Sequence, residues 1–81
     1  MKQQITEEQF DQLPRKVWTI APTISELISF LEKETEQLEA TYHLNDPLHW
    51  QITIVYKGVT AECYAEELCD ALFVCVKHVL S

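Results

Sequence analysis

The longest regular pattern of apolar and polar positions spans residues 22–44, PTISELISFLEKETEQLEATYHL, and it predicts one long amphipathic helix. Its start carries a capping-box pattern, because the side chains of Thr23 and Glu26 can each accept a hydrogen bond from the backbone of the other residue. With about 100° of rotation per residue, one face is apolar and consists of Ile24, Leu27, Ile28, Leu31, Leu38 and Tyr42. Phe30 lies on the flank of that face. The opposite, mainly acidic face consists of Ser25, Ser29, Glu32, Lys33, Glu36 and Glu39.

A second pattern, HWQITIVYKGVTAECY at residues 49–64, alternates between apolar and polar positions and predicts a β-hairpin. If Lys57-Gly58 is a two-residue turn, the apolar side chains of both strands fall on one face, which supports that register. The predicted pairs are Tyr56 with Val59, Ile54 with Ala61, and Ile52 with Cys63. Lys-Gly is a weaker turn signal than Asn-Gly, so the turn type stays open.

Two further helices are predicted toward the ends of the chain. Thr6 and Gln9 form a second capping-box pattern, and this short helix stops before Leu13-Pro14 because proline disfavours helical backbone in the preceding residue. Residues 15–22, RKVWTIAP, permit a short strand and an extended linker equally well. A last helix begins near Ala65, and its apolar face consists of Leu68, Leu72, Cys75, Val76 and Val79.

Val74 departs from the pattern of this last helix. On a helical projection it falls in the polar arc beside Asp70, although it is apolar, and Phe73 lies at the edge of the apolar face. An apolar side chain in a polar arc indicates a contact with another chain, although single exposed apolar residues are also common on protein surfaces.

Together these elements predict the α+β class. We expect a small two-layer domain in which a β-hairpin packs against two main helices, with a short N-terminal helix beside them. The sequence does not decide whether a third short strand joins the hairpin. Residues 1–81 are expected to form a single domain that buries Trp50, Ile52 and Ile54 under the helices.

The balance of charged residues limits the classes of molecule that the protein is expected to bind. Six Lys and Arg residues face thirteen Asp and Glu residues, for a formal net charge of -7. This charge repels phosphate backbones and anionic lipid surfaces, so neither direct nucleic-acid binding nor membrane binding is expected. The opening MKQQITEEQF lacks the apolar core of a signal peptide, and no apolar run approaches the roughly 20 residues of a membrane span. The expected location is therefore cytoplasmic.

Residues that could carry chemistry are few. In the cytoplasm Cys63, Cys69 and Cys75 are expected to be reduced and packed, since free cysteine behaves as a small buried hydrophobe. The spacing of His43 and His49 matches no zinc pattern, and the only glycine lies in the proposed turn rather than in a phosphate-binding loop. We therefore predict no catalytic residue, no cofactor, no metal ligand and no enzymatic activity.

Two surfaces remain as candidates for binding a protein partner. The first is the acidic stripe of the long helix, made by Glu32, Glu36 and Glu39, which could meet a basic surface. The second is the exposed part of the last helix, which comprises Asp70, Phe73, Val74 and Lys77. Either surface could serve a homodimer while the other engages a host target.

Three segments, EEQFDQLPRKV, TISELISFLEK and YAEELCDALFVCVKHVL, resemble a group of small, mostly uncharacterised phage and prophage proteins of Gram-positive bacteria. Members of that group close on an ELCDALW-like helix after a Trp-containing hairpin, and Phe73 here stands where they usually have tryptophan. Their helix is often preceded by a serine cap, which Ala65 replaces, so a frayed helix start is expected. The resemblance implies a phage accessory protein of the bacterial host cell.

Such accessory proteins often bind host or phage proteins, and some inhibit bacterial defence systems such as CRISPR. The sequence therefore predicts a non-enzymatic protein that acts by stoichiometric binding to a protein partner. One alternative is an acidic mimic of nucleic acid that binds a DNA- or RNA-binding protein. A thiol- or metal-binding protein is the remaining alternative.

Overall fold

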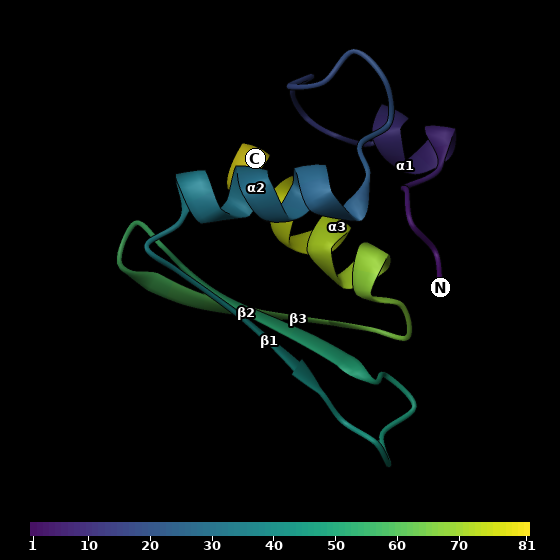
Figure 1. The fold of residues 1–81 in the computed structure, drawn as a ribbon. Coiled ribbons are helices and arrows are strands. Elements are labelled where there is room, and N and C mark those ends of the chain that lie inside the picture. The colour runs from purple at the N-terminus through teal and green to yellow at the C-terminus, as the bar shows by residue number, and fades with distance from the viewer.

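The computed structural model describes all residues, 1–81, and contains three helices and three strands (Figure 1). The helices are α1 (Glu7–Asp11), α2 (Ile24–Glu34) and α3 (Leu68–Leu80). The strands are β1 (Gln37–Tyr42), β2 (Trp50–Tyr56) and β3 (Val59–Ala65).

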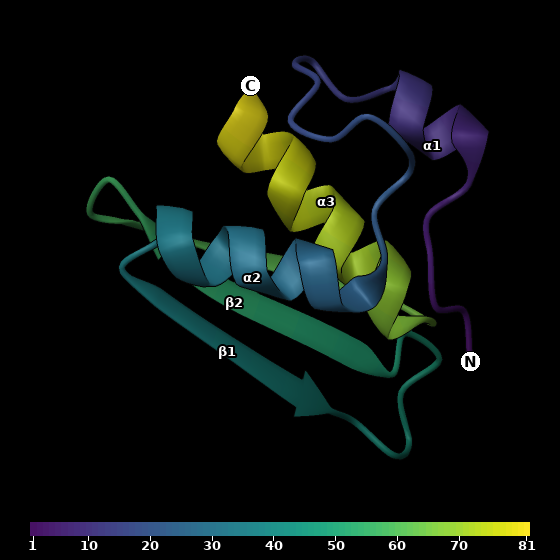
Figure 2. The same cartoon turned by 45° about the horizontal axis from the view of Figure 1, so that its top comes forward.

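The strands form one antiparallel sheet in the order β1-β2-β3, and α2 and α3 cover one face of it (Figures 1 and 2). The other face of the sheet is left uncovered by any helix (Figure 1). The predicted α+β class, with a hairpin packed against two main helices and a short N-terminal helix, is therefore confirmed.

The register of the β2–β3 hairpin also agrees with the prediction. Tyr56 pairs with Val59, and the remaining pairs follow from it, including Ile52 with Cys63. Lys57 and Gly58 form the turn with φ values of 52° and 76°. Positive φ at both central residues is the requirement of a type I′ turn, whose twist matches that of the flanking strands. The turn type that the sequence left open is thus settled, with Lys57 holding a conformation that favours Asn or Gly.

The predicted long helix over residues 22–44 is wrong in its second half. α2 ends at Glu34, Thr35 is extended with φ -114° and ψ 158°, and residues 37–42 form β1 against β2. The predicted apolar positions Leu38 and Tyr42 are four residues apart, a spacing that fits both the helical period of 3.6 and the strand period of two. The strand prevails because it adds a third strand to a hairpin that would otherwise be marginal.

The third strand is therefore not in residues 15–20, where the sequence left a strand and a linker equally open. That segment is an irregular loop, held near its end by an isolated bridge between Gln4 and Thr23. α3 begins at Leu68, three residues after the predicted start, and Glu67 at its N-cap makes no side-chain capping bond. Ala65, predicted to stand at the cap position, is instead the last residue of β3.

Both predicted capping boxes are present, at Thr6–Gln9 and Thr23–Glu26. The core lies between the helices and the sheet. Ile52 and Ile54 are fully buried as predicted, and Trp50 is half-buried. The fully buried aliphatic side chains of α2 are Leu27 and Leu31.

Candidate functional site

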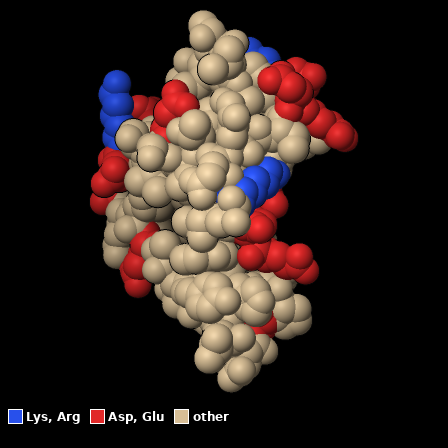
Figure 3. Space-filling view, turned by 45° about the vertical axis from the view of Figure 1, so that its right-hand side comes forward, with Lys and Arg blue, Asp and Glu red and all other residues tan.

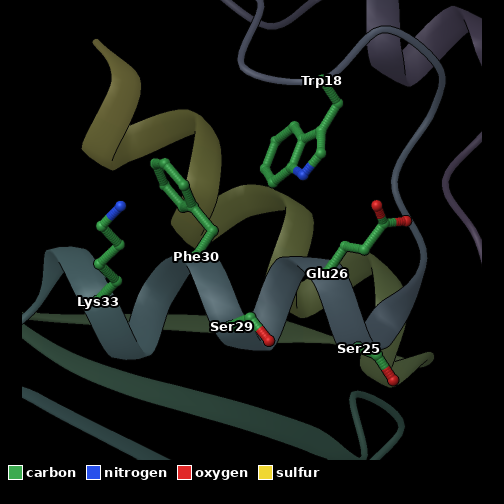
Figure 4. Close-up of a pocket in the computed structure, with 6 residues that line it drawn as sticks. All are labelled: Trp18, Ser25, Glu26, Ser29, Phe30 and Lys33. Carbon is green, nitrogen blue, oxygen red and sulfur yellow. The ribbon is translucent and has the colours of Figure 1, made fainter.

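A groove of about 330 Å³ lies on the outward side of α2, and we call it the aromatic groove (Figure 4). Its lining residues are Trp18, Ser25, Glu26, Ser29, Phe30 and Lys33. Trp18 comes from the loop before α2, and its ring lies 5.3 Å from that of Phe30, centroid to centroid, at an interplanar angle of 59°. A tilted pair of this kind presents both an aromatic face and an edge to any group that enters the groove.

Local structure explains why these side chains face outward. The apolar side of α2 is used against the core, so Ser29 is left on the opposite side, and Phe30, on the flank, reaches both the core and the groove. Leu13 and Ala21, on either side of the loop that carries Trp18, are both buried and anchor it. The Glu26 Oε1 atom accepts from the Thr23 backbone at 3.0 Å, so the capping box also fixes one polar wall of the groove.

The loop that carries Trp18 also has exposed apolar residues. Val17 is 48% exposed and Ile20 is 67% exposed, and both belong to the same loop as Trp18. A concave surface with aromatic walls, carried partly by a loop with exposed apolar residues, is typical of a contact site for another molecule. The sequence analysis missed this site, although one signal was present: the apolar residues of RKVWTIAP follow no strand alternation that would bury them.

The structure separates the residues predicted on the last helix. Val74 is 45% exposed, and Lys77 is exposed near it. Phe73, in contrast, is only 6% exposed and belongs to the core, so its proposed role as a surface contact is wrong in this structure. Its ring joins the core cluster, because packing by neighbouring elements decides whether a position at the edge of an apolar face is buried.

The Asp70 side chain binds other residues of this chain, so it is not free to contact a partner protein. Its Oδ1 atom accepts from Lys2 Nζ at 2.6 Å and from Gln9 Nε2 at 2.9 Å. Burial opposes ionisation, but these hydrogen bonds and the charge of Lys2 outweigh it and lower the pKa of the Asp70 carboxyl below its usual range. Because Gln9 also belongs to the first capping box, Asp70 ties the N-terminal segment to α3.

We expect Asp70→Asn to lower the free energy of unfolding by about 1 kcal/mol at pH 7, since the charge-assisted bonds are lost. A lowered folded-state pKa stabilises the fold above the unfolded pKa, and this contribution disappears as pH falls through the folded value. The gap between native chain and variant should therefore be constant above the unfolded pKa of about 4 and should shrink as pH falls below it in urea titrations. Glu66→Gln, at an exposed site, is the control; an equal gap at every pH would contradict the assignment.

The acidic stripe predicted on the long helix does not exist. Glu32 lies in the last turn of α2, Glu36 lies in the connection to β1, and Glu39 points to the uncovered face of the sheet. The Glu36 Oε1 atom accepts from the Gly58 backbone at 3.0 Å, so it helps to hold the β2–β3 turn. Acidic side chains lie in separate groups over the visible face rather than in one band (Figure 3).

The cysteines are free and buried, as predicted. The Cys75 thiol of α3 donates to the Ile52 carbonyl oxygen at 3.9 Å. The neighbouring Cys63 thiol of β3 and burial raise the pKa of Cys75, and burial raises the pKa of Cys69. The neighbouring Cys75 thiol, in contrast, lowers the pKa of Cys63. Burial keeps reagents away from all three thiols, and the raised pKa values of Cys69 and Cys75 further reduce the fraction of thiolate, which is the nucleophile.

All three cysteines should therefore react with iodoacetamide at least about 100-fold more slowly in the folded chain than in urea, because reaction requires local opening of the core. Mass spectrometry of the alkylated chain over time gives the rates. A cysteine that reacts at the unfolded rate in the native chain would contradict this and would revive a thiol-based function.

The histidines predicted near the β1–β2 turn serve the turn itself. His49 Nδ1 lies 3.0 Å from the His43 carbonyl oxygen, and His43 Nε2 lies 2.7 Å from Gln51 Oε1. No group of three or more His, Cys, Asp or Glu side chains is placed to hold a metal ion. None of the helices combines the length and the apolar character that a membrane crossing requires.

Comparisons of the chain with protein-family models, with curated proteins and with solved structures found no match. The fold defines the protein as a small two-layer α+β domain, and its resemblance to phage proteins stays a prediction.

Proposed function

We propose that this chain is a non-enzymatic phage accessory protein that acts by stoichiometric binding to a protein partner, and that the aromatic groove is the contact site. The observation that carries the proposal is the Trp18–Phe30 pair, which packs against the core on one side and lines a surface groove on the other. Aromatic side chains that line a concave, partly apolar site are the groups that often dominate binding energy at protein interfaces.

The chemistry of the groove suits one apolar or aromatic side chain of a partner. Trp18 and Phe30 supply the apolar walls, and Ser25 and Ser29 supply hydroxyl groups. The net charge of -7 favours a partner with a basic surface around that side chain, because opposite potentials speed association. A protein of a bacterial defence system, CRISPR systems included, is the first class of partner to test, on the strength of the resemblance.

The groove is preferred to the exposed part of α3 for a physical reason. Val74 is a single apolar side chain among Asp70, Lys77 and His78, and isolated exposed apolar residues are ordinary. The groove, in contrast, is a concave site that brings two aromatic rings together.

The test begins with the tagged chain as bait in a lysate of a Gram-positive host, with captured proteins identified by mass spectrometry. The captured protein is then purified and titrated calorimetrically with the native chain and with variants. We expect a stoichiometry near one and a dissociation constant raised about 30-fold or more by Trp18→Ala, the effect of a hot-spot aromatic residue. Tyr64→Ala, at an aromatic residue 46% exposed on the uncovered sheet face, is the matched control.

Binding that Trp18→Ala leaves intact would refute the groove as the contact site. Val74→Glu is the discriminating third variant: if it alone abolishes binding, the contact lies on α3. Turnover of the partner at substoichiometric amounts of this chain would refute stoichiometric binding itself.

A further inference from the structure

β1 is a free edge of the sheet. In Figure 2 it lies at the front, and no other element runs along its outer side. Five of its six residues are exposed, and Leu38 is half-buried. Proteins usually protect such edges with lysine, proline or a covering segment, whereas β1 has only one charged residue, Glu39.

The register identifies which backbone groups are unpaired. The His43 N–H donates to the His49 carbonyl at 2.7 Å, and hydrogen-bonded pairs alternate along an antiparallel ladder. Glu39 and Thr41 therefore bond to Thr53 and Gln51 of β2, and the backbone groups of Leu38, Ala40 and Tyr42 point away from the sheet.

The same three residues carry apolar side chains on the helix-covered face of the sheet. Leu38, Ala40 and Tyr42 pair with Ile54, Ile52 and Trp50, whose side chains face the helices. α2 does not reach across them fully, since Ala40 is exposed and Tyr42 is 50% exposed. The edge thus combines unpaired backbone groups with uncovered apolar surface.

We propose that the chain forms a homodimer in which the β1 strands of two copies pair antiparallel about a twofold axis at Ala40. This register pairs Ala40 with Ala40 of the second copy and Leu38 with Tyr42 of the second copy, and each such pair exchanges two hydrogen bonds. Both helical layers then lie on one side of a continuous sheet of six strands. Glu39 stands opposite Thr41 of the second copy, so no like charges face each other directly.

The other edge strand, β3, is less suited to pairing with a second copy of itself. On β3 the outward backbone groups belong to Thr60, Glu62 and Tyr64, because Tyr56 and Val59 close the two-residue turn as a bonded pair. Self-pairing of those residues is centred on Glu62, which would face Glu62 of the second copy and be repelled. The twofold axis is therefore assigned to β1.

The dimer and the aromatic groove are independent, because the groove lies on the outward side of α2 and the dimer uses the strand edge. A six-residue strand gives an interface at the small end of the range for specific complexes, so dissociation constants on the order of 1 to 100 µM are expected. Sedimentation equilibrium of the full chain from about 1 µM to 1 mM should therefore show a monomer–dimer transition.

A charge swap tests the axis. Ala40→Glu and Ala40→Lys each place like charges opposite one another, so each variant alone should dimerise at least 10-fold more weakly than the native chain. Mixing the two variants should restore the dimer as a heterodimer, which a merely unfolded variant could not do. Thr60→Glu on β3 is the matched control and should dimerise like the native chain.

Three results would overturn the proposal. One is a monomer at every concentration, and another is a native-like dimer in both Ala40 variants. The third is loss of the dimer in the Ala40 variants without recovery on mixing, which removes Ala40 from the axis; loss through Thr60→Glu instead would move the interface to β3. If an added polypeptide pairs with β1 while the chain itself stays monomeric, the edge receives a partner strand and the homodimer is likewise refuted.

Discussion

Leu31→Ala is expected to lower the free energy of unfolding by about 3 kcal/mol. Leu31 is fully buried, and its truncation removes apolar contacts and leaves a cavity that the surrounding side chains fill only in part. An 81-residue domain has a total stability of about 4 to 12 kcal/mol, so this single change removes a large share of it. Urea titration followed by circular dichroism measures the difference.

Leu44→Ala is the matched control for this prediction. Leu44 is 76% exposed in the β1–β2 connection, so the same chemical change should cost less than about 0.5 kcal/mol. Equal losses in the two variants would mean that α2 does not pack its Leu27 and Leu31 side against the sheet. Such a result would also remove the basis for assigning the opposite side of α2 to the aromatic groove.

The β2–β3 hairpin could be predicted in detail because its constraints are local. An alternation at period two and a two-residue turn leave one register in which the apolar side chains of both strands share a face. The capping boxes at Thr6 and Thr23 could also be predicted from the sequence, since each depends on residues only three positions apart.

β1 could not be recognised in the same way, because its identity depends on a partner strand distant in sequence. Leu38 and Tyr42 satisfy a helix and a strand alike, and only the vacant edge of β2 decides between them. The predicted acidic stripe was wrong because it required the long helix, which ends at Glu34. Glu32, Glu36 and Glu39 were assigned to one face by a periodicity that ends at Glu34.

In the candidate site too, local features could be predicted from the sequence, and features that depend on contacts between distant residues could not. The exposure of Val74 followed from position on a single helix and agrees with the structure. The aromatic groove depends on a loop folding back so that Trp18 meets Phe30, twelve residues away, a contact that no period in the sequence encodes. Phe73 likewise lay at the edge of an apolar face, where packing by neighbouring elements decides burial.

Proline substitutions in β1 distinguish strand from helix directly. Glu39→Pro removes an N–H that bonds to β2, whereas Ala40→Pro removes an N–H that points away from the sheet. We therefore expect Glu39→Pro to be about 2 kcal/mol more destabilising than Ala40→Pro, the cost of a broken ladder bond and an unpaired carbonyl on Thr53. Both substitutions carry the same proline ring, so its backbone restriction largely cancels in the comparison.

The measurement is a urea titration of each variant at a concentration where the chain is monomeric, so that loss of a dimer does not enter the difference. In a helix over residues 22–44 both positions would lie in the interior, and each proline would cost about 3 kcal/mol with no preference between them. Equal destabilisation would thus contradict β1 and, with it, the edge on which the proposed dimer depends. A clear difference would establish which backbone groups of this edge are free to pair, because only residues whose N–H is unused by β2 tolerate proline.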